Sequence, residues 1–364
     1  MHENMQQLLM LMKEKRGSDL HITVGAPPVI RVDGELVPLP FDRMSPEMTQ
    51  TLIYSLLTDS QRQRFEAKNE LDLAFGIKGL ARLRMNVFRQ RGSVGCVIRS
   101  ITNIFLNFDE LGLPKMTYEL MKLRKGLILV TGPTGSGKST TLASMVDYLN
   151  SNFNYHIMTV EDPIEYLHAH KKSLVNQREV SEDTETFSSA LKHALRQDPN
   201  VILIGEMRDL ETINAALTIA ETGHLVFGTL HTTDCAQTIN RIIDVFPPHQ
   251  QAQIRVQLSF VLQAVYSQQL VAASAGTGRV VAVETMVVTP AVRNLVREQK
   301  IEQLQMMIQT GGKFGMQTMN VSLADLYRRG KITYLEACNR SSDVEDLKRT
   351  IQQSVTVGGS AGKP

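Results

Sequence analysis

Residues 126–149 constrain the fold of this chain most, because they join three elements in a fixed order. The apolar run Leu127–Val130 predicts a buried strand, and apolar residues at i, i+3, i+4 and i+7 from Leu142 predict an amphipathic helix. Between them, residues 132–139 read G-x-x-x-x-G-K-S. Glycines at this spacing let successive N–H groups turn inward around a phosphate at the helix N-terminus. The segment therefore predicts a nucleotide site.

The loop also predicts which residues contact the nucleotide. Lys138 is expected to reach the β- and γ-phosphates, and the Ser139 hydroxyl to ligate Mg²⁺, so ATP and Mg²⁺ are the expected cofactors. A glycine-rich turn without a ligand is the alternative. The expected nucleotide-binding residues are Gly132, Pro133, Thr134, Gly135, Ser136, Gly137, Lys138, Ser139 and Thr140.

Length and composition narrow the class of protein. A chain of 364 residues has room for two domains, and 42% hydrophobic with 21% charged residues is ordinary for a globular protein. A net charge of +2 gives no strong attraction to nucleic acid, so no nucleic-acid partner is expected. The three cysteines are too scattered for a cysteine zinc site. No apolar run approaches the ~20 residues of a membrane span, so we expect a cytoplasmic protein without a transmembrane segment.

The chain is expected to form an N-terminal α+β unit followed by an α/β unit. The first includes an Asp33–Gly34 hairpin turn and a helix from Ser45 to about Lys68. From Gly126 onward strands alternate with helices, which predicts a mostly parallel sheet. The expected boundaries are an N-terminal domain at 1–105, a linker at 106–120, an ATPase core at 121–290, a helical region at 291–352 and a disordered tail at 353–364.

Polar side chains follow three of the predicted strands. Such groups collect at the carboxyl edge of a phosphate-loop sheet, where phosphoryl transfer needs a Mg²⁺ partner, a group that orients water and a sensor of the γ-phosphate. Glu206, after four aliphatic residues, is the expected Mg²⁺ partner. Glu165, or alternatively Glu161, is expected to polarise water, and His231 to donate to the γ-phosphate. Each carboxylate could instead cap a helix, and the histidine could lie in the core.

Three arginines in the N-terminal unit are candidates for a further catalytic role. Alternation in the strand expected at 82–88 places apolar residues on one face and Arg82 and Arg84 on the other, with Arg99 at the end of the next strand. A solvated sheet face is the simpler explanation. Hydrolases of this kind commonly bring an arginine to the γ-phosphate. If Arg82, Arg84 or Arg99 does so, domain closure or a neighbouring subunit must deliver it.

The ordered set of motifs resembles the secretion-type ATPases, and within them the type IV pilus retraction ATPases. The resemblance rests on an acidic box at 159–165, a Walker B box at 205–209, a histidine box at 222–232 and N-terminal matches at 18–21 and 30–34. It implies an α/β protein with a PAS-like N-terminal domain and a RecA-like core, catalytic Glu165, and inter-domain Arg82 and Arg99.

The resemblance also implies how such a protein works in a cell. It implies a homohexamer at the cytoplasmic face of the inner membrane, attached to the pilus platform protein. This motor extracts pilin subunits, so the filament retracts and powers twitching motility.

Residues 291–298, Ala-Val-Arg-Asn-Leu-Val-Arg-Glu, favour retraction over assembly. They resemble the retraction motif Ala-Ile-Arg-Asn-Leu-Ile-Arg-Glu, although an ordinary amphipathic helix would give a similar pattern. The assembly ATPases carry a four-cysteine zinc module that this chain lacks. A PilU-like accessory retraction ATPase, which would make a PilU-like paralogue a partner, is one alternative. A motor for a secretion or DNA-uptake pseudopilus and a nucleotide-dependent binding module are the others.

Overall fold

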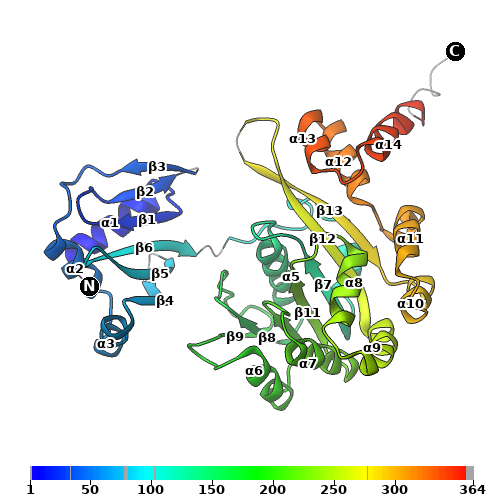
Figure 1. The fold of residues 1–364 in the computed structure, drawn as a ribbon, viewed down its shortest axis with the longest axis horizontal. Coiled ribbons are helices and arrows are strands. Elements are labelled where there is room, and N and C mark those ends of the chain that lie inside the picture. Colours follow the sequence, from blue (N-terminus) through cyan, green and yellow to red (C-terminus); the bar gives the residue numbers. More distant parts are fainter. Residues whose placement is uncertain (1, 33, 78–80, 102–103, 277, 358–364) are drawn as a thin grey trace. The chain divides into compact units, whose positions relative to one another are not determined.

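The computed structural model describes residues 2–32, 34–77, 81–101, 104–276 and 278–357. The chain divides into two compact units (Figure 1). The first comprises Met1–Asn103 with Glu165–Leu167, and the second Ile104–Ile164 with His168–Pro364.

The first unit is built on an antiparallel sheet of strand order β3-β2-β1-β6-β5-β4. One face of the sheet packs on helices, because alternate residues such as Leu83, Met85 and Val87 are buried in a single core with α1, α2 and α3. The elements are α1 (Glu3–Glu14), β1 (Asp19–Ile22), β2 (Val29–Val32), β3 (Glu35–Pro38), α2 (Pro46–Tyr54), α3 (Asp59–Lys68), β4 (Glu70–Ile77), β5 (Ala81–Gln90) and β6 (Ser93–Ile101).

The single helix expected from Ser45 to Lys68 is wrong, because the chain forms two helices there. Thr58 starts the second one: its hydroxyl accepts from Gln61 N at 3.3 Å, and the Gln61 side chain accepts from Thr58 N at 2.9 Å. This reciprocal capping box satisfies two N–H groups that would donate to backbone carbonyl oxygens in a continuous helix. The expected hairpin is confirmed by the pairing of Val32 with Glu35. Residue 33 of its turn lies outside the described residues.

The second unit is built on a sheet of strand order β13-β12-β7-β11-β10-β8-β9, in which only the β12–β13 pair is antiparallel within the part described. The elements are α4 (Met116–Leu120), β7 (Gly126–Thr131), α5 (Lys138–Asn152), β8 (His156–Glu161), β9 (Leu174–Glu179), α6 (Phe187–Ala194), β10 (Val201–Ile204), α7 (Leu210–Glu221), β11 (Leu225–Leu230), α8 (Cys235–Asp244), α9 (Pro248–Val261), β12 (Leu262–Ala272), β13 (Arg279–Val287), α10 (Pro290–Arg297), α11 (Leu304–Thr310), α12 (Met319–Arg328), α13 (Tyr334–Arg340) and α14 (Val344–Val357).

Continuous aliphatic runs form the central strands because both faces of this sheet are covered. In β7, Leu127 and Leu129 face a core shared with α7, α8 and α9, whereas Ile128 and Val130 face a second core shared with α5. The expected α/β class with a mostly parallel sheet is confirmed. The long β12–β13 hairpin, which adds two strands beside β7, was not expected.

Two expected segment assignments need correction. The linker predicted at 106–120 belongs to the second unit, because Phe108, Leu111 and Leu113 are buried in the core beside α5. The disordered tail predicted at 353–364 begins with residues that continue α14 to Val357. Residues 358–364 lie outside the described residues.

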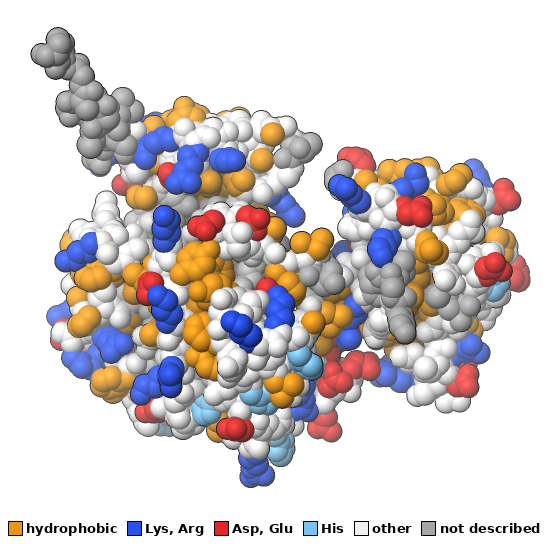
Figure 2. All heavy atoms as spheres, turned by 180° about the vertical axis from the view of Figure 1, so that it is seen from behind, with side chains coloured by type: hydrophobic (Ala, Val, Ile, Leu, Met, Phe, Trp, Pro, Cys, Tyr) orange, Lys and Arg blue, Asp and Glu red, His pale blue; other side chains and the backbone are white. Residues whose placement is uncertain are grey.

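The surface mixes charges of both signs. Figure 2 shows Lys and Arg side chains interspersed with Asp and Glu on the visible face of each unit. Among the helices that the structure describes, none is both long enough and apolar enough to cross a membrane.

Candidate active site

The loop of residues 132–137 joins β7 to α5 through backbone conformations that favour glycine. Gly132, Gly135 and Gly137 have φ values of +140°, +77° and +90°. The loop therefore curls back on itself ahead of the first turn of α5. Lys138, in that turn, donates from Nζ to the Gly132 carbonyl oxygen at 2.8 Å and to the Pro133 carbonyl oxygen at 3.2 Å.

The loop residues fit a nucleotide phosphate. The Ser136 hydroxyl is buried and has no hydrogen-bond partner among the described atoms, which leaves a polar group inside the loop available to a ligand. Gly132 is packed so closely that an added Cβ would lie within 3.0 Å of Ser136. The Lys138 amine and the Ser139 hydroxyl are the groups that phosphate and Mg²⁺ take in such loops.

A buried glutamine that the sequence did not single out supports the loop. Gln268, on β12, is fully buried and donates from Nε2 to the Ser136 carbonyl oxygen at 2.9 Å. The two residues are 132 positions apart, so local patterns cannot pair them. No sequence signal distinguishes Gln268, because β12 also carries Gln263, Ser267 and Gln269.

Glu206 and His231, predicted from two different strands, come together in the second unit. Nε2 of His231 lies 2.8 Å from Oε1 of Glu206, and Arg208 forms an ion pair with the same carboxylate. Burial alone would raise the pKa of Glu206, but the hydrogen bond from Arg208 and the nearby His231 outweigh it and lower that pKa. Glu206 is therefore held ionised. Arg208 belonged to the predicted Walker B box but had no predicted role.

Backbone contacts fix the positions of these two side chains. The Thr229 hydroxyl donates to the Gly205 carbonyl oxygen at 2.5 Å, and Met207 N donates to the Thr229 carbonyl oxygen at 3.0 Å. The ends of β10 and β11 are thus tied together where Glu206 and His231 leave them.

The two candidate bases of the acidic box, Glu161 and Glu165, have different surroundings. Glu161, the alternative candidate for polarising water, accepts hydrogen bonds from Thr159 and Gln177, both on Oε1, so that oxygen is already engaged. Glu165 is exposed, and residues 165–167 group with the first unit while their neighbours on both sides group with the second. The catalytic role of Glu165 stays a prediction.

The three candidate arginines share one face of the first unit's sheet. Arg84 is the cross-strand partner of Arg99, and Arg82 lies two residues along β5 on the same face. Nε of Arg99 donates to the buried Asp19 carboxylate at 2.7 Å, although the Arg99 side chain is 65% exposed. Arg99 thus has a structural partner within its own unit, and its catalytic role also stays a prediction.

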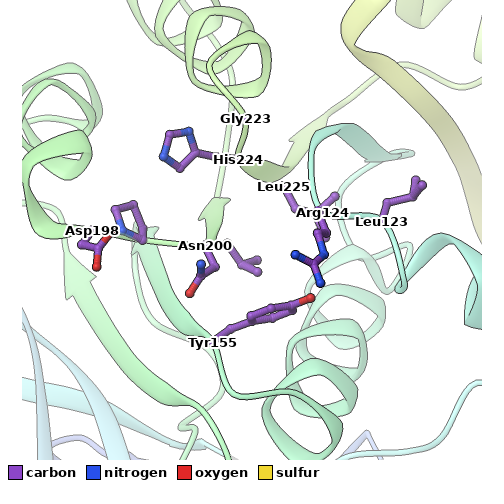
Figure 3. A pocket seen from close by; sticks show the side chains of 10 residues that line it. Leu123, Arg124, Tyr155, Asp198, Asn200, Gly223, His224 and Leu225 are labelled. Atoms are coloured by element: carbon purple, nitrogen blue, oxygen red, sulfur yellow. The ribbon is translucent and has the colours of Figure 1, made fainter.

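A pocket at the opposite edge of the sheet is separate from this site. It has a volume of about 300 Å³ and lies where β7, β8, β10 and β11 begin; Arg124, Tyr155, Asn200 and His224 line it (Figure 3). His224 and His231 belong to the same predicted histidine box. They precede and follow β11, so a strand of six residues, about 20 Å long, separates them. His224 therefore lies away from Glu206.

No cluster of three or more His, Cys, Asp or Glu side chains suited to a metal occurs among the described residues. Mg²⁺ in nucleotide sites generally keeps several waters and takes its remaining ligands from substrate phosphates and one or two protein groups. Ser139 and Glu206 remain the expected protein partners.

The chain is similar to known proteins over nearly its whole length. The chain is 51% identical over 341 residues, 94% of its own length and 99% of the relative's, to the Pseudomonas aeruginosa protein named Type IV pilus retractation ATPase PilT. It is 40% identical to Type IV pilus ATPase PilU of the same organism, with 95% of this chain and 91% of the relative covered.

A solved structure and a family model agree with these relatives. The crystal structure of the pilus retraction motor PilT with bound ADP superimposes with a TM-score of 0.88 at 51% identity, covering 94% of this chain and 99% of that one. This match confirms the predicted fold class. The family model described as Type II/IV secretion system protein matches residues 2–340. The chain therefore belongs to the Type II/IV secretion system protein family.

Proposed function

We propose that this protein is an ATP-hydrolysing motor that powers retraction of type IV pili. The observation that carries the proposal is the Glu206–His231 pair beside an intact phosphate loop, in a chain that matches a relative named as a retraction ATPase over nearly its full length. The similar solved structure, a pilus retraction motor with bound ADP, supports a nucleotide as the ligand.

The loop would hold the triphosphate. Its N–H groups and the Lys138 amine would stabilise negative charge on the β- and γ-phosphates, and the Ser139 hydroxyl would be a ligand of Mg²⁺. Lys138 must first leave the Gly132 and Pro133 carbonyl oxygens, which it contacts here. Mg²⁺, when bound, would neutralise charge on the phosphate oxygens.

Glu206, His231 and Glu165 would supply the proton chemistry. Glu206 is held ionised by Arg208 and His231, so it suits the outer sphere of a cation. His231, whose Nε2 lies against Glu206, could donate to a phosphate oxygen from Nδ1 when both ring nitrogens carry protons. Glu165 is the proposed base that polarises water, and Arg82 and Arg99 are the proposed charges that neutralise the γ-phosphate in the transition state.

The proposal includes an assembly. The motor would be a homohexamer at the cytoplasmic face of the inner membrane, docked on the pilus platform protein. The division of the candidate groups between the two units supports a ring in which bound nucleotide sets the orientation of the units.

ATP turnover by the purified full chain tests the enzymatic half of the proposal. The unmodified protein should hydrolyse ATP in the presence of Mg²⁺. Lys138→Ala should lose nucleotide binding, and Glu165→Gln should keep binding but lose turnover by about 10² or more. Turnover that persists in both variants would contradict the assignment.

Retraction itself requires a test in cells. Deleting the gene should leave cells piliated yet unable to twitch, because pili assemble but are not withdrawn. Bald cells would instead indicate a role in assembly. The 40% identity to a PilU protein supports an accessory ATPase as the second candidate. In that case, this chain expressed without any paralogue would fail to restore twitching.

A further inference from the structure

Glu284 is a buried carboxylate outside the nucleotide site that has no role in the proposed chemistry. It lies on β13 and is 3% exposed. Its Oε1 accepts a hydrogen bond from Cys235 N, the first residue of α8, at 2.9 Å. The carboxylate also faces the backbone N–H of Met319, the first residue of α12. One side chain therefore lies at the N-termini of two helices, both labelled in Figure 1.

A carboxylate is well suited to this place but costly to bury. The N-terminus of a helix carries unsatisfied N–H groups and partial positive charge, which an anion stabilises. Burial raises the pKa of Glu284, the N–H of Cys235 opposes that shift, and Asp234 adds to it. An apolar side chain could fill the same space without this cost. The contacts of Glu284 with the N-termini of two helices therefore explain its presence better than packing does.

Helix α8 directly follows the segment that carries His231. His231 is followed by three residues, and α8 begins at Cys235. Asp234 caps that helix by accepting from Gln237 N at 2.7 Å. The Thr232 hydroxyl lies 2.7 Å from the Thr238 hydroxyl. The segment after His231 is thus fixed onto the first turn of α8, so the helix start sets where His231 points.

The other helix leads to the C-terminal helical region. Backbone groups of Thr285 and Gln317 exchange hydrogen bonds at 2.9 and 3.1 Å, and Val283 N donates to the Ser322 hydroxyl at 3.0 Å. Leu323 of α12 and Leu347 of α14 are fully buried in one core. A displacement of α12 or α14 therefore reaches β13 next to Glu284.

We propose that Glu284 is a positioning residue that couples the C-terminal helices α12–α14 to His231 through the N-terminus of α8. The inference goes beyond the proposed retraction function and rests only on the ATPase activity within it. The route is a contiguous set of contacts, from α12 to Glu284, to Cys235 and along residues 231–235 to the Glu206–His231 pair.

Steady-state ATP hydrolysis by the full chain tests the assignment of Glu284. Glu284→Ala should lower kcat by about tenfold or more while changing KM for ATP by less than about threefold, because the phosphate loop is untouched and only the catalytic histidine moves. Glu284→Gln keeps one acceptor oxygen for Cys235 N and should retain more of kcat than Glu284→Ala.

Thr117→Val is the matched control. It removes a buried hydrogen bond of the second unit, between the Thr117 and Tyr266 hydroxyls at 3.0 Å, that involves neither Glu284, α8 nor α12. It should lower the thermal stability and leave kcat unchanged. If Thr117→Val and Glu284→Ala lower kcat equally at equal losses of stability, Glu284 is structural and the proposal is wrong.

A double-mutant cycle tests the coupling itself. Arg328→Ala removes the hydrogen bond from Arg328 to the Thr350 carbonyl oxygen, which ties α12 to α14, without opening a cavity in the core. It should lower kcat in the unmodified protein and add nothing once Glu284 is alanine. Hydrogen exchange at residues 232–236 should rise in both single variants. Additive effects on kcat, or unchanged exchange in Arg328→Ala, would overturn the coupling. If the unmodified chain hydrolyses no ATP, the proposed function fails first, and the exchange measurement alone decides the coupling.

Discussion

Alanine substitutions at two loop glycines separate backbone strain from steric collision. Gly135 has φ +77° and open space where a Cβ would point. Gly132 has φ +140°, and a Cβ there would lie within 3.0 Å of both the Gln268 carbonyl oxygen and the Ser136 hydroxyl. The two substitutions therefore differ mainly in the collision.

The expected costs follow from these two environments. Gly135→Ala forces a left-handed conformation on alanine, which costs about 1–2 kcal/mol of unfolding free energy. Gly132→Ala adds overpacking against main chain, typically about 1–3 kcal/mol, to strain of about 1–3 kcal/mol, so it should cost about 2–6 kcal/mol. The backbone of β12 cannot move aside cheaply, because it is hydrogen-bonded along both of its edges.

Urea unfolding without nucleotide measures both costs, because a bound phosphate would introduce its own contacts with the new methyl group. The transition of the second unit should shift more for Gly132→Ala than for Gly135→Ala, and ATP turnover should fall in the same order. Equal losses, or a larger loss for Gly135→Ala, would refute the argument that β12 presses on the loop at Gly132.

Three further predictions concern charged and titratable groups. Burial lowers the pKa of His168 from 6.5 to about 4, so the native state resists a proton that the unfolded chain accepts below pH 6.5. The unfolding free energy, measured with urea, should fall by about 3 kcal/mol between pH 6.5 and 4, and His168→Gln should remove that fall. If the unfolding free energy of both proteins depends on pH in the same way, the prediction is contradicted. The pKa of Glu206 is lowered in the native state, so the ionised carboxylate stabilises the fold above pH 4.5, its ordinary pKa. This contribution to the unfolding free energy is lost as the pH falls through the lower native pKa, and Glu206→Gln should lack that loss. Arg99→Ala should destabilise the first unit by about 1–3 kcal/mol, because it leaves the buried Asp19 carboxylate without its cation, and Asp19→Asn should rescue most of that loss; if the two substitutions are additive, the pair is not coupled.

Local patterns predicted the phosphate loop and the strands beside it well. Leu127–Val130 and Val201–Ile204 are continuous aliphatic runs because helices cover both faces of the sheet. The polar residues that follow these strands lie at one edge because the strands are parallel. The meeting of Glu206 with His231 follows from that topology. The distance between the two side chains does not follow from the topology, because it depends on the hydrogen bond between Thr229 and Gly205 that joins the strand ends.

The failures have physical causes as well. The break between α2 and α3 depends on Thr58 and Gln61, a capping pair whose spacing is visible in the sequence but competes with a strong helical pattern on either side. Gln268 and Glu284 act through partners 132 and 49 positions away, which no local pattern can supply. The position of Glu165 depends on which unit its loop joins, and the sequence alone does not determine that.

Single-turnover hydrolysis of pre-bound ATP tests most directly whether the Glu206–His231 pair is catalytic. Glu206→Gln and His231→Gln should bind ATP within about threefold of the unmodified protein and lose about 10²-fold or more in the rate of hydrolysis. Unchanged rates in both variants, or a loss explained entirely by weaker ATP binding, would contradict the account.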